Sequence, residues 1–303
     1  MMETIAVVDI GTNSIKCLIA EIDQTTYFPL EEVLFNCRLG QGLYHSGSLS
    51  PEAMERSLSA LDACMATARR HHAGKIIAVG TMALRSAKNA DVFIEKVRSL
   101  GILIRVLSGE EEARLSYRAA VQCPAGEKVV CDIGGGSTEC ILGKGKELTV
   151  RKSLRVGAVL AWEKFIHTDP VSREEFSAME RYIAKEIKGH APQARASQIV
   201  AVGGTATTMA AVHLEMSTYC AAEIQGTLLS RDDIERQLQR YLARTTARRR
   251  EIPGLPQARA DIIIAGATIV AKLMDFFGAS TLKVSNCGLR HGVILDRYFS
   301  EGT

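Results

Sequence analysis

A short motif occurs twice in this sequence, and its recurrence limits the folds that the chain can adopt. Residues 9–14 read DIGTNS and residues 132–137 read DIGGGS, so the frame Asp-Ile-Gly-x-x-Ser recurs at a separation of 123 positions. Each copy follows one short apolar run and precedes another, which is the pattern of two β-strands joined by a tight turn. Because the two copies open two similarly ordered halves, the sequence indicates an internal duplication.

Both halves continue as alternating strands and helices. The first half predicts strands at 4–10, 15–22, 31–39, 75–80 and 102–107, with helices after Ser50, at 93–100 and from 108 onward. The second half predicts strands at 128–133, 138–143, 147–154 and 198–204, with helices after Ser172 and Ser230. Mixed strands and helices in this order predict an α/β fold.

The chain is long enough for about two domains of ordinary size. Residues 122–128, QCPAGEK, contain Pro124 and Gly126 and are the predicted connection between them. We therefore expect one domain at 1–123 and a second at 124–288. A terminal helix at 289–303 is expected to join the first domain.

Composition and charge narrow the function classes. The formal net charge is only +3, so the chain lacks the strong positive field of a nucleic-acid coat, and any preference for anions must be local. The N-terminus has no basic segment before its apolar run, and the longest apolar stretch, 262–271, is too short to cross a bilayer. The eight cysteines have no metal-binding spacing. These features predict a cytoplasmic protein with reduced thiols that binds neither nucleic acid nor membranes.

The two glycine loops have a chemical interpretation and a plain structural one. Glycine permits positive φ and removes the Cβ that would keep a phosphate away, and successive N–H groups in such a turn can surround an anion. An aspartate at the end of the strand can hold a metal ion beside the phosphate. The same residues are also common in ordinary hairpin turns. Two matched loops, one in each half, favour a phosphate-binding site.

A third glycine motif, VAVGGTATTMAA at 200–211, reads as a strand, Gly203-Gly204-Thr205 and then a helix. The N-terminus of a helix that begins with small residues suits contact with a phosphate or a nucleotide. Close packing of the helix on the strand would need glycine equally, and both interpretations stay open.

The segment SGEEEARL at 108–115 separates a structural role from a chemical one. Ser108 and Glu111 fit a capping box, and acidic residues are favoured in a first helical turn. Glu112 lies on the face of Leu115 and Ser116 and is expected to point inward, where a carboxylate needs a partner. Glu139, after the triple-glycine loop, is the expected second carboxylate, and the two together could hold a divalent cation.

A run of arginines, RTTARRRE at 244–251, also has two interpretations. Basic residues at the end of a helix are favoured by its dipole and are usually solvated. Alternatively, the run forms a track for an anionic substrate.

Five segments together carry a family resemblance: VVDIGTNSIK, GTMALRSAKN, LSGEEEARLSY, DIGGGSTE and CGLRHGVILDR. With them the chain resembles the exopolyphosphatase/guanosine pentaphosphate phosphohydrolase (Ppx/GppA) family in its short two-domain form, from the first strand to about residue 298. The combination of DIGGGSTE with SGEEEA is specific, whereas the first loop is shared across the actin-like fold superfamily.

This resemblance implies two ribonuclease-H-like (actin-like ATPase superfamily) domains with an interdomain cleft, where terminal phosphate is removed from polyphosphate or pppGpp. It implies Glu112 as the base that activates water, with Glu139 and Arg85 as further catalytic residues. The implied metal ligands are Asp9, Asp132 and Glu139. The implied phosphate-binding residues are Asn13, Ser14, Lys16, Gly134, Gly135, Gly136, Ser137 and Thr138. Arg290 is a weaker candidate.

The resemblance also implies Mg²⁺ or another divalent cation as cofactor, K⁺ as a further candidate cation, and a homodimer. The expected ligands are polyphosphate and guanosine penta- or tetraphosphate. Lys16 stands where the family usually has arginine, which gives a point charge without a bidentate grip on phosphate.

Two other functions remain open from the sequence. A sugar-kinase-like enzyme or ATPase of the same superfamily would transfer phosphate to a hydroxyl, but SGEEEA favours hydrolysis. A non-catalytic sensor of polyphosphate or alarmone would have no reason to hold carboxylates against a polyanion.

Overall fold

The computed structural model of this protein describes residues 2–121, 127–145 and 147–299. The chain forms two compact units, Met1–Leu115 with Leu289–Thr303, and Ser116–Gly288. Pro124 and Gly126 of the predicted connection, and the predicted boundary between residues 123 and 124, lie outside the described residues. None of the helices in the described ranges is long and apolar enough to span a bilayer.

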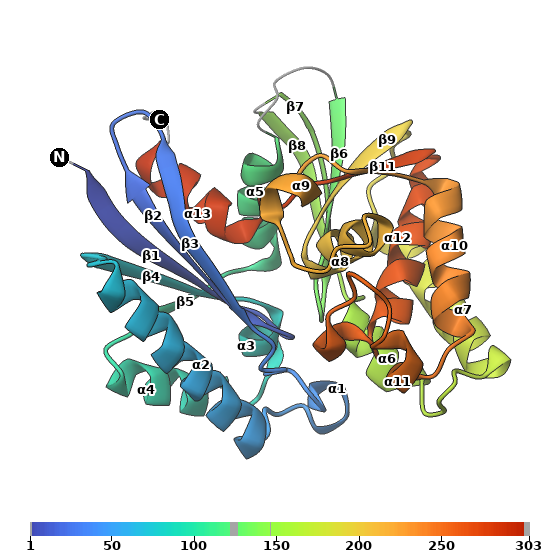
Figure 1. Ribbon diagram of the computed structural model, residues 1–303, viewed down its shortest axis with the longest axis horizontal. Coiled ribbons are helices and arrows are strands. Elements are labelled where there is room, and N and C mark those ends of the chain that lie inside the picture. The colour runs from blue at the N-terminus through green and yellow to red at the C-terminus, as the bar shows by residue number, and fades with distance from the viewer. Residues whose placement is uncertain (1, 122–126, 146, 300–303) are drawn as a thin grey trace. The chain divides into compact units, whose positions relative to one another are not determined.

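The first unit contains one five-stranded sheet in the order β3-β2-β1-β4-β5 (Figure 1). Its strands are β1 (Glu3–Ile10), β2 (Ile15–Ile22), β3 (Tyr27–Phe35), β4 (Lys75–Gly80) and β5 (Ile104–Val106). Its helices are α1 (Leu43–Ser46), α2 (Pro51–Arg70), α3 (Met82–Ser86), α4 (Ala90–Ser99) and α13 (Leu289–Tyr298), and α5 (Gly109–Ala120) begins in this unit.

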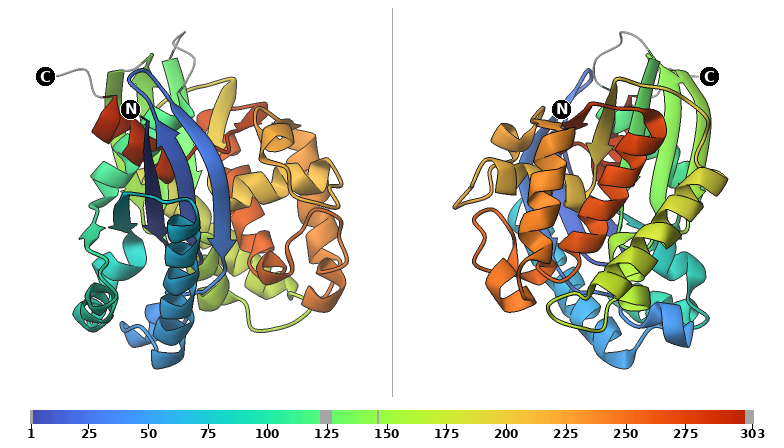
Figure 2. Two further views of the ribbon diagram at one scale, coloured as in Figure 1. Left: turned by 60° about the vertical axis from the view of Figure 1, so that its left-hand side comes forward. Right: turned by 90° about the vertical axis from the view of Figure 1, so that its right-hand side faces the viewer.

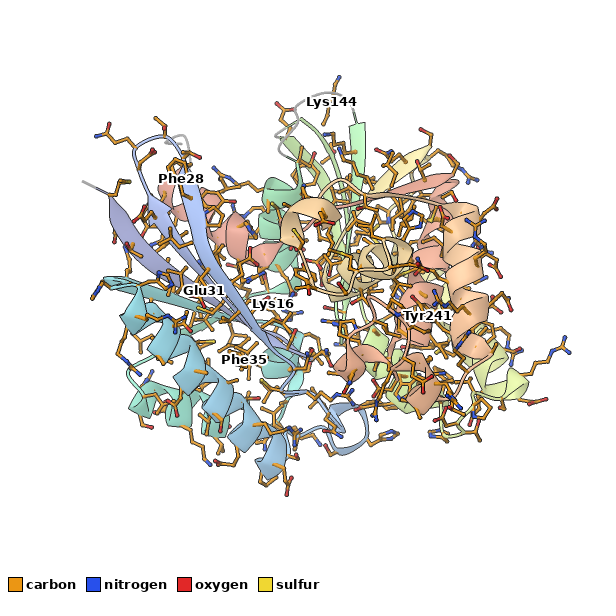
Figure 3. All side chains as sticks on the ribbon, viewed as in Figure 1. Lys16, Phe28, Glu31, Phe35, Lys144 and Tyr241 are labelled. Carbon is orange, nitrogen blue, oxygen red and sulfur yellow. The ribbon has the colours of Figure 1, made fainter. Side chains whose placement is uncertain are left out.

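Alternation along the central strands gives this sheet two apolar faces. Ala6, Val8 and Ile10 belong to a core with the side chains of α2 and α4. Ile5 and Val7 belong to a second core with α13. Figure 3 labels Lys16 on β2, and Phe28, Glu31 and Phe35 along β3, which is an edge strand of this sheet.

The second unit contains a six-stranded sheet in the order β10-β11-β9-β6-β7-β8. Its strands are β6 (Glu127–Ile133), β7 (Thr138–Lys144), β8 (Glu147–Leu154), β9 (Gln198–Val202), β10 (Leu228–Ser230) and β11 (Thr281–Val284). Its helices are α6 (Ala158–Phe165), α7 (Arg173–His190), α8 (Gly204–His213), α9 (Ala221–Ile224), α10 (Arg231–Leu242), α11 (Thr246–Arg249) and α12 (Ile263–Phe277), with a 3₁₀ turn, η1, at Gln257–Arg259.

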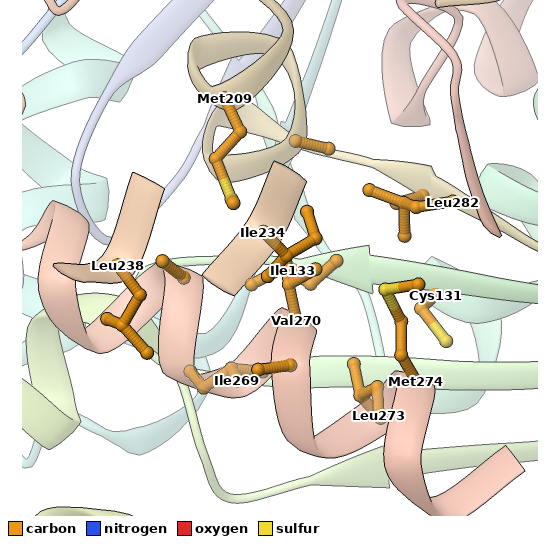
Figure 4. Close-up of a cluster of buried hydrophobic side chains, with 14 of the residues drawn as sticks. Cys131, Ile133, Met209, Ile234, Leu238, Ile269, Val270, Leu273, Met274 and Leu282 are labelled. Carbon is orange, nitrogen blue, oxygen red and sulfur yellow. The ribbon is translucent and has the colours of Figure 1, made fainter. Parts of the chain in front are cut away.

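The core of the second unit lies between its sheet and the apolar helix α12. Figure 4 shows Cys131 and Ile133 of β6 beside Val270 and Met274 of α12. Helices α7, α8 and α10 pack against α12, and Figure 2 shows α10 and α12 side by side in its right-hand view. The hydrogen bond with Cys131, together with burial, raises the pKa of the Cys140 thiol, so this buried cysteine packs as a small apolar residue, as the sequence predicts.

Five strands of the second sheet repeat the topology of the first sheet, which supports the duplication read from the sequence. In the first sheet β1 pairs antiparallel with β2 and parallel with β4. In the second sheet β6 pairs antiparallel with β7 and parallel with β9. The chain therefore consists of two α/β domains of the actin-like, ribonuclease-H-like kind, which confirms the predicted fold class.

Local signals placed the starts of α2, α7 and α10 correctly. The side chain of Ser50 accepts a hydrogen bond from the N–H of Ala53 and caps α2 (3.2 Å). Capping boxes begin α7 at Ser172 and α10 at Ser230. These bonds satisfy N–H groups that the first helical turn leaves without a partner.

The predicted strand at 31–39 is wrong in its bounds. The strand β3 runs from Tyr27 to Phe35 instead. Its extension is excluded because Arg38 has a left-handed φ of 51° and donates its N–H to the carbonyl of Asn13. The short helices α3, α6 and α11 were not predicted, since segments of four to eight residues carry little periodic signal.

Candidate functional site

The first glycine loop closes as a turn in which three carbonyl groups accept hydrogen bonds. The N–H of Gly11 donates to the carbonyl of Ser14 (3.0 Å). The carbonyl groups of Thr12 and Asn13 accept the N–H groups of Gly40 and Arg38 (2.9 Å each). In the described part of the chain, the N–H groups of Thr12, Asn13 and Ser14 make no hydrogen bond.

Asn13 has a buried atom that lacks a hydrogen-bond partner. The side chain is 5% exposed, and its Nδ2 donates to Oδ1 of Asn36 (3.3 Å), while its own Oδ1 has no partner. Rotation of both amides by 180° exchanges donor and acceptor and keeps their mutual bond. Asn13 can thereby offer either kind of group at the loop. A buried polar atom without a partner is costly in the free protein and is what a bound ligand can satisfy.

The triple-glycine loop repeats this arrangement in the second unit. The N–H of Gly134 donates to the carbonyl of Ser137 (3.0 Å). The carbonyl groups of Gly134 and Gly135 accept the first N–H groups of α6, at 2.8–3.1 Å. Over the described residues, the N–H groups of Gly135, Gly136 and Ser137 donate to nothing. In both loops three carbonyl groups are engaged and three described N–H groups are unpaired, which suits an anion-binding turn.

Glycine is required beside the second loop because the backbones approach closely. A Cβ added at Gly157 would lie 2.4 Å from the carbonyl carbon of Gly135 and 2.5 Å from the nitrogen of Gly136. Real Cβ atoms do not make such contacts, so the first turn of α6 can support the loop only with glycine at 157.

Two carboxylates lie next to each other at the ends of β6 and β7. Asp132 and Glu139 are direct cross-strand partners, and Ser153 continues the row on β8. Oγ of Ser116 donates to Oδ2 of Asp132 (2.6 Å), and Oγ of Ser153 donates to Oε1 of Glu139 (2.7 Å). Each serine fixes one oxygen of its carboxylate.

The third glycine motif lies against Asp132. Gly203 has a left-handed φ of 96°, and a Cβ there would lie 2.9 Å from Oδ1 of Asp132. Gly204 opens α8, and a Cβ there would lie 2.1 Å from Nη2 of Arg259. Arg259 is 8% exposed, so a buried guanidinium contacts the first turn of α8. Close packing therefore accounts for both glycines, while the motif also adjoins the candidate site.

Glu112 points inward, as its position on α5 predicts. It is 9% exposed, and its Oε2 accepts a hydrogen bond from Nη1 of Arg85 (2.9 Å). The same Nη1 donates to the carbonyl of Leu107 (2.8 Å). The capping box of Ser108 and Glu111 begins this helix. Arg85 is thus a cationic partner for Glu112 within the first unit.

The remaining candidate residues are distributed as follows. Asp9 and Lys16 are direct cross-strand partners on β1 and β2, the same relation that Asp132 has to Glu139. Ser14 and Ser137 are 6% and 5% exposed. The hydroxyl of Thr138 donates to the carbonyl of Val156 (2.6 Å), so its proton is already committed.

The first unit therefore holds Asp9, Asn13, Ser14, Lys16, Arg85 and Glu112, and the second holds Asp132, Gly134, Gly135, Gly136, Ser137, Thr138 and Glu139. Within the described ranges, no three His, Cys, Asp or Glu side chains are grouped closely enough to hold a metal ion by themselves.

Several partners of these residues carried little sequence signal. Ser116 was placed on the inward face of α5, but its bond to Asp132 joins residues 16 positions apart. Asn36, Ser153 and Arg259 were not singled out, because their partners lie on other elements. Only the presence of a polar residue on an inward-facing stripe could have indicated Ser116.

The structure shows surroundings for Arg290 and Arg249 that the sequence did not indicate. Arg290 pairs with Glu32 (2.8 Å) and donates to the carbonyl of Cys17 (3.4 Å), which accounts for it as a structural residue. Arg249, in the run interpreted as a solvated helix end, is 0% exposed. The solvated interpretation is therefore wrong for Arg249, because four protein acceptors replace water around its guanidinium.

Comparison with known proteins gives a consistent result. The model of the Ppx/GppA phosphatase family matches residues 18–301. The chain is 32% identical to exopolyphosphatase 2 of Mycobacterium tuberculosis, over 96% of this chain and 97% of that protein. It is 30% identical to the Ppx/GppA family member of Aquifex aeolicus, whose crystal structure matches with a TM-score of 0.83 over the whole of both chains. An exopolyphosphatase from Cytophaga hutchinsonii matches with a TM-score of 0.88 at 27% identity, over 98% of each chain.

Proposed function

Because this chain belongs to the Ppx/GppA phosphatase family and is a phosphoric anhydride hydrolase, we propose that it removes terminal phosphate from inorganic polyphosphate, pppGpp or both. The observation that carries this proposal is the shared state of the two glycine loops. In each loop three carbonyl groups are engaged, while three successive N–H groups in the described chain have no partner. Unpaired N–H groups of this kind suit phosphate oxygens.

In the proposed mechanism, each loop supplies donors for phosphate oxygens. Asn13, Ser14 and Lys16 contribute from the first unit, and the N–H groups and hydroxyl of the triple-glycine loop contribute from the second. Lysine suits this role as a point charge on a phosphate oxygen. Thr138 contributes through its backbone or as an acceptor, since its hydroxyl proton is donated to Val156.

Glu112 is the proposed base. It accepts a proton from the attacking water while the water oxygen forms a bond to the terminal phosphorus. The bridging P–O bond breaks, and its electron pair leaves with the shortened chain. Arg85 holds the Glu112 carboxylate through a 2.9 Å bond and is itself fixed by the carbonyl of Leu107. Phosphoryl transfer depends mainly on such positioning and charge neutralisation.

Asp132 and Glu139 are the proposed residues for a divalent cation, with Asp9 as a further ligand. Mg²⁺ typically takes one or two carboxylates and completes its shell with water and substrate phosphate. Two neighbouring carboxylates that are each fixed by a serine match that requirement. When bound, the ion would neutralise charge on the phosphate oxygens. Mg²⁺ as the ion, K⁺ as a second cation, a homodimer and a cytoplasmic location belong to the same proposal.

The test is phosphate release from long polyphosphate, tripolyphosphate and pppGpp in parallel, with Mg²⁺ or with EDTA. The variant Glu112→Gln is compared with Glu110→Gln, which makes the same charge change at an exposed position of the same helix. We expect Glu112→Gln to lower kcat at least about 100-fold, the usual contribution of a general base, and Glu110→Gln to change it little. Equal activity of the two variants would refute the role of Glu112. Phosphate transfer to an added sugar hydroxyl in place of water would refute hydrolysis.

A further inference from the structure

The arginine run beyond α10 concentrates the positive charge of the chain. Residues 240–251 contain five arginines and one glutamate, a local formal charge of +4 in a chain whose net charge is +3. The remaining 291 residues therefore have a formal net charge of −1. Such a concentration marks a local site of attraction for anions.

Arg249 anchors this segment from within. Its Nε donates to the carbonyl of Ala260 (2.6 Å), and its Nη1 donates to the carbonyl groups of Arg244 (2.6 Å) and Tyr241 (3.2 Å). Its Nη2 donates to Oγ1 of Thr246 (2.7 Å). One buried side chain thus ties the end of α10, the helix α11 and the segment before α12 together. The arginines on either side of it are carried by a fixed backbone.

The neighbouring arginines are available to a ligand. Arg250 is exposed, and no side-chain bond is found for it in the described residues. The side chain of Arg248 is 71% exposed, and its partner Glu251 is 62% exposed. A solvent-exposed ion pair of this kind contributes little, so Arg248 can exchange Glu251 for an anion at small cost.

The same segment leads to the first turn of α8. Arg249 donates a hydrogen bond to the carbonyl of Ala260. The residue before Ala260 is Arg259, whose guanidinium contacts Gly204. Arg259 and Arg249 are both buried, so they support this part of the second unit from within.

The arginine run has no exposed aromatic side chain, which indicates the kind of anion that it suits. Single-stranded nucleic acids are held by aromatic side chains on which bases stack. Within 240–251 the aromatic residue is Tyr241, which is 0% exposed, and the nearby Trp162 is half-buried, with its ring centroid 5.8 Å from the guanidinium carbon of the buried Arg249. A polyanion without bases matches these arginines better.

We propose that Arg248 and Arg250, held in place by Arg249, bind the distal part of a long inorganic polyphosphate chain. We call the group Arg240, Arg244, Arg248 and Arg250 the arginine surface. This inference rests on the proposed function and specifies its substrate as long inorganic polyphosphate, because each further phosphate of the chain adds a negative charge that an exposed arginine can bind.

The test measures binding separately from turnover. The dissociation constants of long polyphosphate and of tripolyphosphate are measured in a Glu112→Gln background, with and without the double change R248E/R250E. The control is R69E/R98E, which makes the same change in net charge at exposed positions of the first unit. R248K/R250K keeps the charges and should retain affinity. Melting curves verify that every variant is folded.

We expect R248E/R250E to weaken long polyphosphate at least about tenfold more than the control does, and to leave tripolyphosphate unchanged. Unchanged affinity for the long chain, or equal losses for both lengths, would overturn the proposal. The proposal would also be overturned if single-stranded DNA or anionic vesicles bound as tightly as long polyphosphate and lost as much affinity in R248E/R250E, because the surface would then bind polyanions in general. Failure of the proposed function would appear differently, as bound polyphosphate that wild-type protein does not hydrolyse.

Discussion

Replacement of Ser116 by alanine isolates the hydrogen bond that fixes Asp132. Ser116 is 0% exposed, and its hydroxyl donates to Oδ2 of Asp132 at 2.6 Å. A hydrogen bond to a charged group contributes about 1.5–3 kcal/mol net, so Ser116→Ala should lower the free energy of unfolding by about that amount. The change adds no atoms and leaves α5 a good helix former, because alanine has the highest helix propensity.

Ser57 provides the matched control. It is also 0% exposed and lies on a helix, but its hydroxyl donates to a neutral carbonyl of that helix, at Ala53 (2.7 Å). That carbonyl keeps its backbone hydrogen bond when the hydroxyl is removed. We therefore expect Ser57→Ala to cost less than about 1 kcal/mol. Denaturant unfolding of both variants gives the comparison directly.

The functional consequence of Ser116→Ala separates positioning from packing. Partners that orient the ligands of a metal typically change metal affinity or activity by about 10- to 100-fold when removed. If Asp132 holds the cation, half-maximal activity of Ser116→Ala should require about 10- to 100-fold more Mg²⁺, with kcat largely recovered at saturation. Calorimetric titration with Mn²⁺ provides a readout without turnover. A variant that loses stability but keeps the wild-type dependence on Mg²⁺ would refute the positioning role of Ser116.

Two further perturbations test the loop and the edge strand. Gly157→Ala would place a Cβ 2.4 Å from the carbonyl carbon of Gly135 and displace the loop, which should reduce phosphate release at least about tenfold because a misplaced binding group is costly to catalysis. In the control Gly189→Ala, the added Cβ meets nothing within 4 Å and should stabilise the protein by about 0.5–1 kcal/mol. Melting curves and activity assays distinguish the two variants. Burial would raise the pKa of Glu32, but the hydrogen bond with His291 and the charge of Arg290 lower it from 4.5 to about 2. The stability that this lowered pKa provides is present above about pH 4.5 and is lost as the pH falls towards 2. The melting temperature of wild type should therefore exceed that of Glu32→Gln by less and less across this pH window. A constant difference in melting temperature would contradict the assignment.

The fold was predictable where local chemistry and periodicity agree. Apolar runs before DIGTNS and DIGGGS predicted the hairpins, and capping residues predicted α2, α7 and α10. The end of β3 was not predictable, because NCRL at 36–39 reads as strand while hydrogen bonds from Arg38 and Gly40 draw the backbone to the first loop. Contacts between segments distant in sequence decided that boundary, and no local pattern records them.

The candidate site likewise has features that the sequence predicts and features that it does not. Glycine loops and an inward Glu112 follow from residue type and helical position. The engaged state of the loop carbonyl groups depends on the partners Gly40 and α6, which sequence reasoning had no means of identifying. The burial of Arg249 was likewise hidden, because a buried guanidinium needs four acceptors that only the folded chain supplies.

The duplication itself suggests how the two halves divide the chemistry. At equivalent positions, Asp9 lies opposite Lys16, whereas Asp132 lies opposite Glu139. The first pair is neutral in total, but the second brings two negative charges together, an arrangement that destabilises a sheet unless something compensates it. Serine hydrogen bonds orient these carboxylates without removing their charge. We therefore propose that the second half supplies most of the cation ligands, while Lys16 of the first half contacts phosphate directly. A single change of charge sign between two copies of one hairpin is sufficient to produce this difference.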